Sequence, residues 1–426
     1  MSGREEFRSL LARGRELVLA AAIVGAATGV AVAGFERLTV DVLFDHVARL
    51  PVALLAFAPG VGLAIAALWL RGPGRGANRA TSDEYLDAFH GRRELRVRDL
   101  VHKLVAAVAT LGSGNAMGLE GPSIFLGATI GAATQRRFLR FLNGADPNLL
   151  LVAGAAAGIA AILKAPATGA VFALEVPYQD DLARRMLLPA LVAAASGYLA
   201  FVAINGTTPL FPVTGAPPFS FVDLAGAAAL GVTAGVGARV FAWLLLWAKR
   251  IAARGNAAVR VAAAGGSIAA LFAIGRGLTG ESLVLTPGYG VVTWALDPRR
   301  TVGILLAILV LRCLATTASV GGGGVGGLFV PLVVAGALVG RAFGIAVGGD
   351  DSLFLVVGVA AFLGAGYRVP LAAVMFVAET TGRAGFVVPA VIAAVVSELV
   401  MNTSSVTTHQ MRRAPGMAEG TNPDSA

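Results

Sequence analysis

Long apolar runs separated by short polar segments restrict this chain more than any other feature of its sequence. A run of about 20 apolar residues is what a helix needs to cross a lipid bilayer. Only 14% of the 426 residues are charged, whereas soluble domains carry about 25%. The sequence therefore predicts an all-α protein that crosses a membrane many times. It excludes a disordered chain, a nucleic-acid-binding domain and an ordinary cytosolic enzyme. The longer runs are 17–35, 51–70, 100–112, 148–163, 186–204, 221–248, 258–275, 301–318, 328–348, 352–366 and 386–401.

The excess of positive charge lies between the apolar runs. The net charge is +9, and almost all of the basic residues are arginines. The arginine-rich segments are 4–15, 92–98, 136–140, 184–185 and 412–413. Because basic loops mark the cytoplasmic side of a membrane protein, we expect both termini in the cytoplasm and the chain in the inner membrane of the cell. Membrane lipid, and not nucleic acid, is the partner that this pattern predicts.

Two segments in the two halves of the chain repeat one pattern. Residues 157–175 and 361–379 align without gaps. The coinciding pairs are Pro166 with Pro370, Phe172 with Phe376, and Glu175 with Glu379. Such a repeat, in runs broken by Gly or Pro, predicts two halves with a binding site between them. The expected limits are one membrane domain over 1–413, repeats over 17–205 and 221–413, and a short polar tail over 414–426.

A glycine-rich break leads into an apolar helix in each half. In the first half, Gly118 and Gly121 permit an extended or left-handed backbone before Pro122, which suits the first turn of a helix. Gly327 and Pro331 repeat the arrangement in the second half. A helix that starts inside the membrane points free N–H groups and the positive end of its dipole into a cavity. Two such starts near the midplane would bind a small anion without a basic side chain.

One carboxyl group, that of Glu120, lies inside the first of these breaks. An ionisable residue at membrane depth is a candidate functional group. When ionised, its carboxylate would occupy the anion site at the helix N-terminus. When protonated or displaced, it would swing away. Glu120 would then be a gate that responds to pH and to the anion, and not merely a helix cap.

The two breaks resemble the signature segments of one membrane-protein family. Gly112-Ser-Gly-Asn-Ala-Met-Gly-Leu-Glu-Gly-Pro122 is similar to the G-[KR]-E-G-P segment of CLC chloride channels and transporters, and Gly326-Gly-Leu-Phe-Val-Pro331 to their G-G-I-F-A-P segment. With the repeats, the resemblance covers about residues 15–413, and it is to prokaryotic members that lack C-terminal CBS domains. It implies the CLC-type fold of two inverted-topology repeats with many short, tilted or broken helices. It also implies a homodimer in which each subunit has its own anion pathway.

The resemblance assigns roles residue by residue. It makes Glu120 the external gating glutamate, and it makes Glu175 and Glu379 structural helix glutamates. Leu328 and Phe329 would offer backbone N–H groups to the central anion. The anion-binding set that it implies is Gly118, Leu119, Gly121, Leu328, Phe329, Ala80, Thr81 and Thr407.

Three positions depart from the family pattern. Leu119 replaces the basic residue before the gating glutamate, which removes a charge near the outer mouth. The family's inner serine falls on Ala80 when the segment is aligned through Glu84. The family's inner tyrosine falls within Ser405-Val-Thr-Thr-His-Gln410, which gives its role to Thr407 or a neighbour. Both inner ligands are altered, so the inner gate and the halide selectivity are open questions.

Two modes of transport fit these residues. Antiporters of the family often carry an acid directly after the helix glutamate, but Val176 follows Glu175, as in passive members. Small side chains at Ala80 and Thr407, in place of a phenol, would leave a weak inner barrier and favour the same mode. Our main expectation is therefore gated, passive transport of chloride and similar small anions, controlled by Glu120. The alternative is a proton-coupled chloride or halide antiporter of the same fold. Asp180 and Asp181 could then admit protons, although a solvated loop explains them more simply.

No motif in the sequence indicates an enzyme, a metal site or a bound cofactor. The four histidines lack the spacing of metal ligands, and no nucleophile is paired with a base. Chloride would be the substrate of this protein and not its cofactor.

Overall fold

The computed structural model describes residues 3–138, 146–208, 220–285 and 288–413. All regular elements in these ranges are helices, and eight of them are long and apolar enough to cross a membrane. The expectation of an all-α polytopic membrane protein is confirmed. The polar tail over 414–426 lies outside the described residues.

The helices follow the predicted apolar runs. In the first half they are α1 (Gly3–Arg37), α2 (Asp45–Ala48), α3 (Val52–Arg71), α4 (Ser82–Phe89), α5 (Val97–Gly112), α6 (Glu120–Phe138), α7 (Leu149–Leu163), α8 (Pro166–Glu175) and α9 (Leu187–Asn205). In the second half they are α10 (Phe221–Ala253), α11 (Ala257–Thr279), α12 (Tyr289–Ala295), α13 (Val302–Gly322), α14 (Phe329–Val347), α15 (Asp351–Tyr367), α16 (Pro370–Thr381) and α17 (Val387–Met401).

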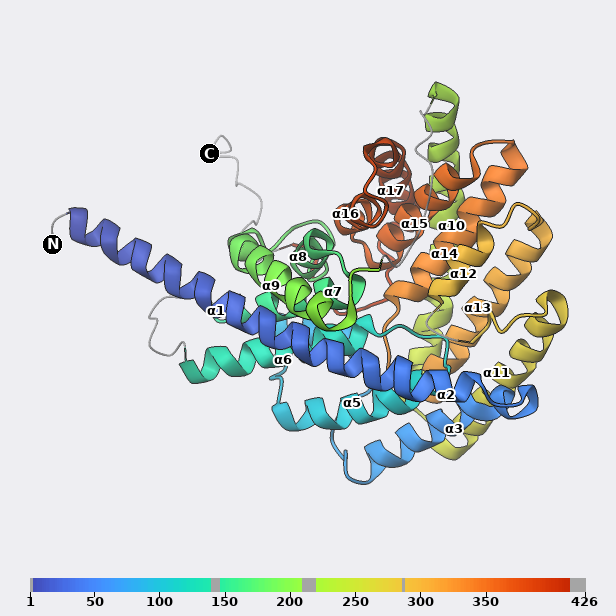
Figure 1. The fold of residues 1–426 in the computed structure, drawn as a ribbon, viewed down its shortest axis with the longest axis horizontal. Helices are drawn as coiled ribbons and strands as arrows, with labels where there is room; N and C mark the ends of the chain where they lie inside the picture. Colours follow the sequence, from blue (N-terminus) through green and yellow to red (C-terminus); the bar gives the residue numbers. More distant parts are fainter. Residues whose placement is uncertain (1–2, 139–145, 209–219, 286–287, 414–426) are drawn as a thin grey trace, which may run out of the picture.

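The two halves form two groups of helices that lie side by side. Figure 1 shows α6, α7, α8 and α9 on one side, crossed by the long α1, and α10 to α17 on the other. Helix α3 leaves the first group and lies against α11 of the second. The site described below lies where the two groups meet.

Glycines allow equivalent helices to pack closely in the two halves. An added Cβ at Gly127 of α6 would overlap the carbonyl oxygen of Gly154 on α7. In the second half, an added Cβ at Gly336 of α14 would overlap the carbonyl oxygen of Gly358 on α15. Such close approach of backbones at small residues is typical of helix pairs in membranes. These glycine contacts thus occur in both halves, in parallel with the sequence repeat.

Two breaks between helices leave short helices that are buried at the centre of the protein. Lys164 and Arg368 have left-handed backbones, with φ of 52° and 58°. Each of them ends one helix, and the proline two residues later begins the next helix. All of α7 is buried, although its 15 residues are too few to span a bilayer. These short helices are therefore surrounded by protein, where neighbouring elements satisfy their ends.

Loops rich in arginine gather at one end of the bundle, which we call the basic end. The ring of His90 lies 2.9 Å from the carbonyl oxygen of Pro177, and Arg92 donates to the carbonyl of His409 at 3.3 Å. The backbone N–H of Met411 donates to Pro177 at 3.1 Å. The loops over 90–93, 177–184 and 409–412 thus form one surface.

Candidate anion site

The two glycine-rich breaks meet at the centre of the molecule. Gly118 and Gly327 exchange backbone hydrogen bonds, with N···O distances of 2.9 and 2.6 Å, as an isolated antiparallel bridge. Helix α6 begins two residues later at Glu120, and α14 begins two residues later at Phe329. The two helix N-termini therefore start from one point, as the sequence predicts.

The carboxylate of Glu120 fills the space between these helix starts. Its Oε1 accepts a hydrogen bond of 2.7 Å from the backbone N–H of Val330, in the first turn of α14. Its Oε2 is buried and has no hydrogen-bond partner among the described residues. An added Cβ at Gly118 or Gly327 would overlap this carboxylate. The glycines thus leave a cradle that is sized for an anionic group and bordered by N–H donors.

Gly121 completes the cradle on its inner side. An added Cβ there would overlap the hydroxyl of Thr81 and lie 2.8 Å from the Cα of Gly327. Thr81 is buried, and its hydroxyl donates to the carbonyl of Gly326 at 3.3 Å. The structure therefore brings Thr81 to the site, together with Gly118, Gly121 and Gly327. Pro122 and Pro331 lie in the first turns of α6 and α14, where a missing N–H costs no hydrogen bond.

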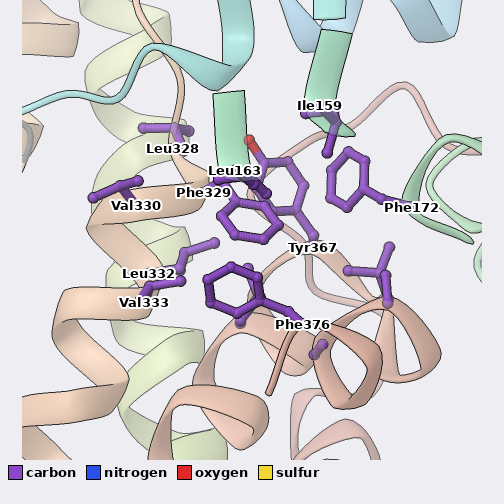
Figure 2. Packing of buried hydrophobic residues seen from close by; sticks show 14 of the residues in the cluster. Ile159, Leu163, Phe172, Leu328, Phe329, Val330, Leu332, Val333, Tyr367 and Phe376 are labelled. Carbon is purple, nitrogen blue, oxygen red and sulfur yellow. The ribbon is translucent and has the colours of Figure 1, made fainter. Parts of the chain in front are cut away.

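An aromatic cluster packs around Phe329, at the start of α14 (Figure 2). The ring of Phe172 lies 5.6 Å from Phe329 and 5.4 Å from Tyr367, and Phe329 lies 5.1 Å from Phe376, all as edge-on contacts. The hydroxyl of Tyr367 points away from Phe376, and it hydrogen bonds to the side chain of Ser82 and to the backbone of Leu328. A phenol thus stands between the cradle and the basic end.

The three residues that depart from the family pattern, two predicted at the inner end and Leu119 near the outer mouth, lie in different environments. Ala80 offers its carbonyl to the ammonium of Lys103 at 2.7 Å and lines a cavity at the basic end. Thr407 is buried and hydrogen bonds to Asp83, and it does not line that cavity. Leu119 is buried in the apolar core. Of these three residues, only Ala80 lies on the path that leads from the basic end toward Tyr367.

The cavity at the basic end has a volume of about 540 Å³, and its charged lining residues are mostly basic: Arg79, Lys249 and Arg250, against Asp83. It reaches from Arg79, Lys249 and His409 inward to Leu328 and Tyr367. We call it the anion vestibule, because cations at a cleft raise the local concentration of anions.

Ion pairs hold the walls of the anion vestibule. Burial alone would raise the pKa of Asp83, but the ammonium of Lys249, 2.5 Å away, lowers this pKa below its usual range overall. Behind the wall, Lys103 and Glu84 form a buried ion pair, and Arg93 lies 2.7 Å from the same carboxylate. Because Lys103 also holds the carbonyl of Ala80, this pair fixes the loop that leads into α4.

Each half caps a helix of the other half with a glutamate. Glu175, at the end of α8, accepts hydrogen bonds from the backbone N–H groups of Leu371 and Ala372 in α16, at 3.0 and 2.8 Å. Glu379 of α16 accepts from Ala167 and Thr168 in α8, at 2.7 and 2.6 Å. Both carboxylates satisfy N–H groups that a broken helix would otherwise leave unpaired.

Tyr367 and Ser82 are the site residues that the sequence analysis missed. Tyr367 corresponds to Leu163 in the aligned repeat, so one copy has a phenol where the other has an apolar side chain. That difference within an otherwise apolar segment is the signal that could have identified it. Ser82 lies two residues after Ala80, the position to which the alignment through Glu84 gave the inner serine.

Comparison with known proteins places the chain among anion transporters. The family described as voltage gated chloride channel matches residues 62–402. An H(+)/Cl(-) exchange transporter ClcA of Cronobacter sakazakii is 29% identical over 412 residues, which cover 90% of this chain and 87% of that protein. The ClcA of Citrobacter koseri is 29% identical over 399 residues, with 88% and 83% covered.

Solved structures share the fold. A CLC-type fluoride/proton antiporter matches with a TM-score of 0.78 at 20% identity, over 94% of this chain and 98% of the other. A slow cyanobacterial Cl-/H+ antiporter matches with a TM-score of 0.77 at 22% identity, over 90% and 94%. The expected CLC-type fold of inverted repeats is thereby confirmed.

Proposed function

Because the chain belongs to the voltage gated chloride channel family, known as CLC, we propose that it exchanges chloride for protons across the cell membrane. This is the alternative of the sequence analysis and not its main expectation, which was passive transport. The relatives are named as exchange transporters or antiporters, and none of them as an enzyme. Exchange requires that the pathway is never open at both ends at once.

The hydroxyl of Tyr367 is the observation that carries this proposal. The expectation of a passive channel rested partly on the loss of a phenol at the inner end, where small side chains would leave a weak barrier. Tyr367 supplies a phenol from another part of the chain and hydrogen bonds to Ser82 and Leu328. In our proposal this phenol closes the inner end, while the carboxylate of Glu120 fills the cradle.

In the mechanism that we propose, Glu120 is bound by the cradle in competition with the anion. The ionised carboxylate occupies the cradle and accepts the N–H of Val330. A chloride ion that enters from either side takes over the N–H donors of the helix starts. The displaced carboxylate binds a proton, turns out of the cradle and releases the proton on the outer side. Gly118, Gly121 and Gly327 leave one space that holds either the carboxylate or the anion. Binding of the anion is therefore linked to displacement and protonation of the carboxylate.

Proteoliposomes would test the proposed exchange. With a chloride gradient imposed, we expect the wild-type protein to pump protons against their gradient at a fixed ratio to chloride. The E120Q variant keeps the shape of the side chain but cannot release a proton, so chloride flux should continue while proton pumping falls at least tenfold. Chloride flux in the wild type with no uphill proton movement would instead support the passive channel.

Two further proposals concern assembly and orientation. We expect a homodimer in the inner membrane, with the basic end and both termini in the cytoplasm, because basic loops are retained there. Light scattering of the detergent-solubilised protein would give the mass of two chains. A protease added outside intact cells should fail to cleave at Arg184 and Arg185.

A further inference from the structure

A second cavity opens at the basic end, on the other side of the segment that contains Tyr367. It has a volume of about 540 Å³. Its charged lining residues are Glu175, Asp180, Asp181, Arg184, Arg368, Glu398 and Arg412. Tyr367 lines the anion vestibule, and the next residue, Arg368, lines this second cavity. We call it the acidic cavity.

Glu398, on α17, has an oxygen that the protein leaves unpaired in this cavity. Its Oε1 lies 2.9 Å from the guanidinium of Arg368. Its Oε2 is buried and has no hydrogen-bond partner among the described residues. A buried carboxylate oxygen without a donor is unfavourable, unless it binds a proton or a water molecule.

Glu398 shares the cation that it contacts with a second carboxylate. Arg368 is nine-tenths buried, and the same nitrogen that binds Glu398 also lies 3.2 Å from Asp180. Arg412 is 3.5 Å from the other oxygen of Asp180, and Glu175 is close enough to repel Glu398 electrostatically. Glu398 and Asp180 thus share one guanidinium, that of Arg368, while Glu175 is held by backbone N–H groups of α16.

The other charged groups near the cavity form no ion pair with Glu398 among the described residues. Asp181 lies 3.9 Å from Arg184, so these two residues form a pair of their own. Arg239 of α10 reaches α17 through the carbonyl of Val400 and remains exposed. Because Glu398 shares its guanidinium with Asp180 and its buried Oε2 has no donor among the described residues, the arrangement favours a proton on Glu398.

One aromatic layer separates the acidic cavity from Glu120. Along α8, Phe172 lies three residues before Glu175, a rise of about 4.5 Å in an α-helix. The ring of Phe172 contacts Phe329, and the next residue, Val330, donates its N–H to Glu120. A proton that reaches Glu175 is therefore one helical turn from the ring that packs beneath the gate.

We propose that Glu398 is the residue that takes up the proton from the solution at the basic end and delivers it, through the acidic cavity, toward Glu120. A proton from water binds to Oε2 of Glu398, passes to Glu175 or to water in the cavity, and ends on the carboxylate of Glu120. No electrons are transferred, and each carboxylate returns to its ionised form. This inference rests on the proposed exchange of chloride for protons. Glu398 would take over proton uptake from the acid that antiporters of the family often carry at the position of Val176.

The test measures chloride and proton fluxes separately in proteoliposomes that contain the full chain. For E398Q we expect chloride flux within about twofold of the wild type and proton pumping reduced at least tenfold. E398D keeps a carboxylate and should recover a substantial part of the pumping. The matched control is E281Q, which also removes a glutamate that lies beside an arginine, Arg300, but outside the cavity. It should leave both fluxes unchanged.

A second variant distinguishes a loss of proton transfer from a folding defect. E398Q leaves Arg368 with only Asp180, so the double variant E398Q/R368Q removes the buried cation together with its partner. It should also transport chloride without pumping protons. Proton pumping at the wild-type ratio in E398Q or in the double variant would overturn the role of Glu398 and leave the proposed exchange intact. A wild-type protein that pumps no protons would overturn the exchange itself, and this inference with it.

Discussion

At the scale of single residues, the site depends on what two side chains do in a space shaped by glycines. Glu120 fills the cradle from above, and Tyr367 closes the inner end with one hydroxyl that reaches Ser82 and Leu328. Because the cradle itself is backbone, the residues that control it can be changed without removing the anion site.

The hydroxyl of Tyr367 can be removed alone. In Y367F the ring still packs against Phe172, but the hydrogen bonds to Ser82 and Leu328 are lost. We expect a leakier inner end, with chloride flux increased severalfold and fewer protons pumped per chloride. Flux assays in proteoliposomes would measure both quantities. S82A, which removes the partner hydroxyl, should shift them in the same direction and less strongly. An unchanged ratio in Y367F would contradict a barrier at this residue.

The sequence predicted the outer part of the site well and the inner part poorly. Gly118, Glu120 and Gly327 lie in local motifs, where a few neighbouring residues determine a break and a helix start. Tyr367 lies far along the chain from Ser82, and only the packing of the repeats brings the two together. Thr407 was expected at the inner end from its position in a motif, but its side chain turns to Asp83. Side chains that meet only through tertiary structure leave no such local pattern.

At the scale of helices, close backbone contacts hold each half together. Gly127 and Gly336 occupy equivalent places, each against the backbone of the following helix. We expect G127A and G336A each to destabilise the protein by about 1–3 kcal/mol, because helices that pack backbone to backbone cannot absorb an added methyl group without moving apart. Thermal unfolding in detergent would measure both effects. G290A, where an added Cβ meets no atom within 4 Å, is the control and should unfold near the wild-type temperature.

At the scale of the whole molecule, the basic end joins segments from both halves and is sensitive to acid. Burial lowers the pKa of His90 below its ordinary value of 6.5, despite the nearby carbonyl of Pro177. The unfolded chain therefore binds a proton at this residue more readily than the folded chain does. Stability should fall as the pH drops below about 6.5 and through the lower pKa of the folded state.

The H90Q variant tests this contribution. Glutamine can still donate to Pro177 but does not titrate, so the loss of thermal stability between pH 8 and pH 5.5 should be smaller than in the wild type. H46Q, at an exposed histidine on α2, should keep the full loss. If both variants lose as much stability as the wild type, acid sensitivity arises at other groups.

The bridge between Gly118 and Gly327 has a consequence for how such a site can be built. The bridge pairs equivalent positions of the two repeats, so the residue two places after each glycine is also equivalent: Glu120 in one copy and Phe329 in the other. Two identical half-length chains, associated in the same way, would place either two acids or two phenylalanines at this point. Two acids would repel each other across one cradle, and two phenylalanines would leave it without a proton carrier. Joining the halves in one polypeptide allows a nearly symmetric scaffold to hold a single, asymmetric acid.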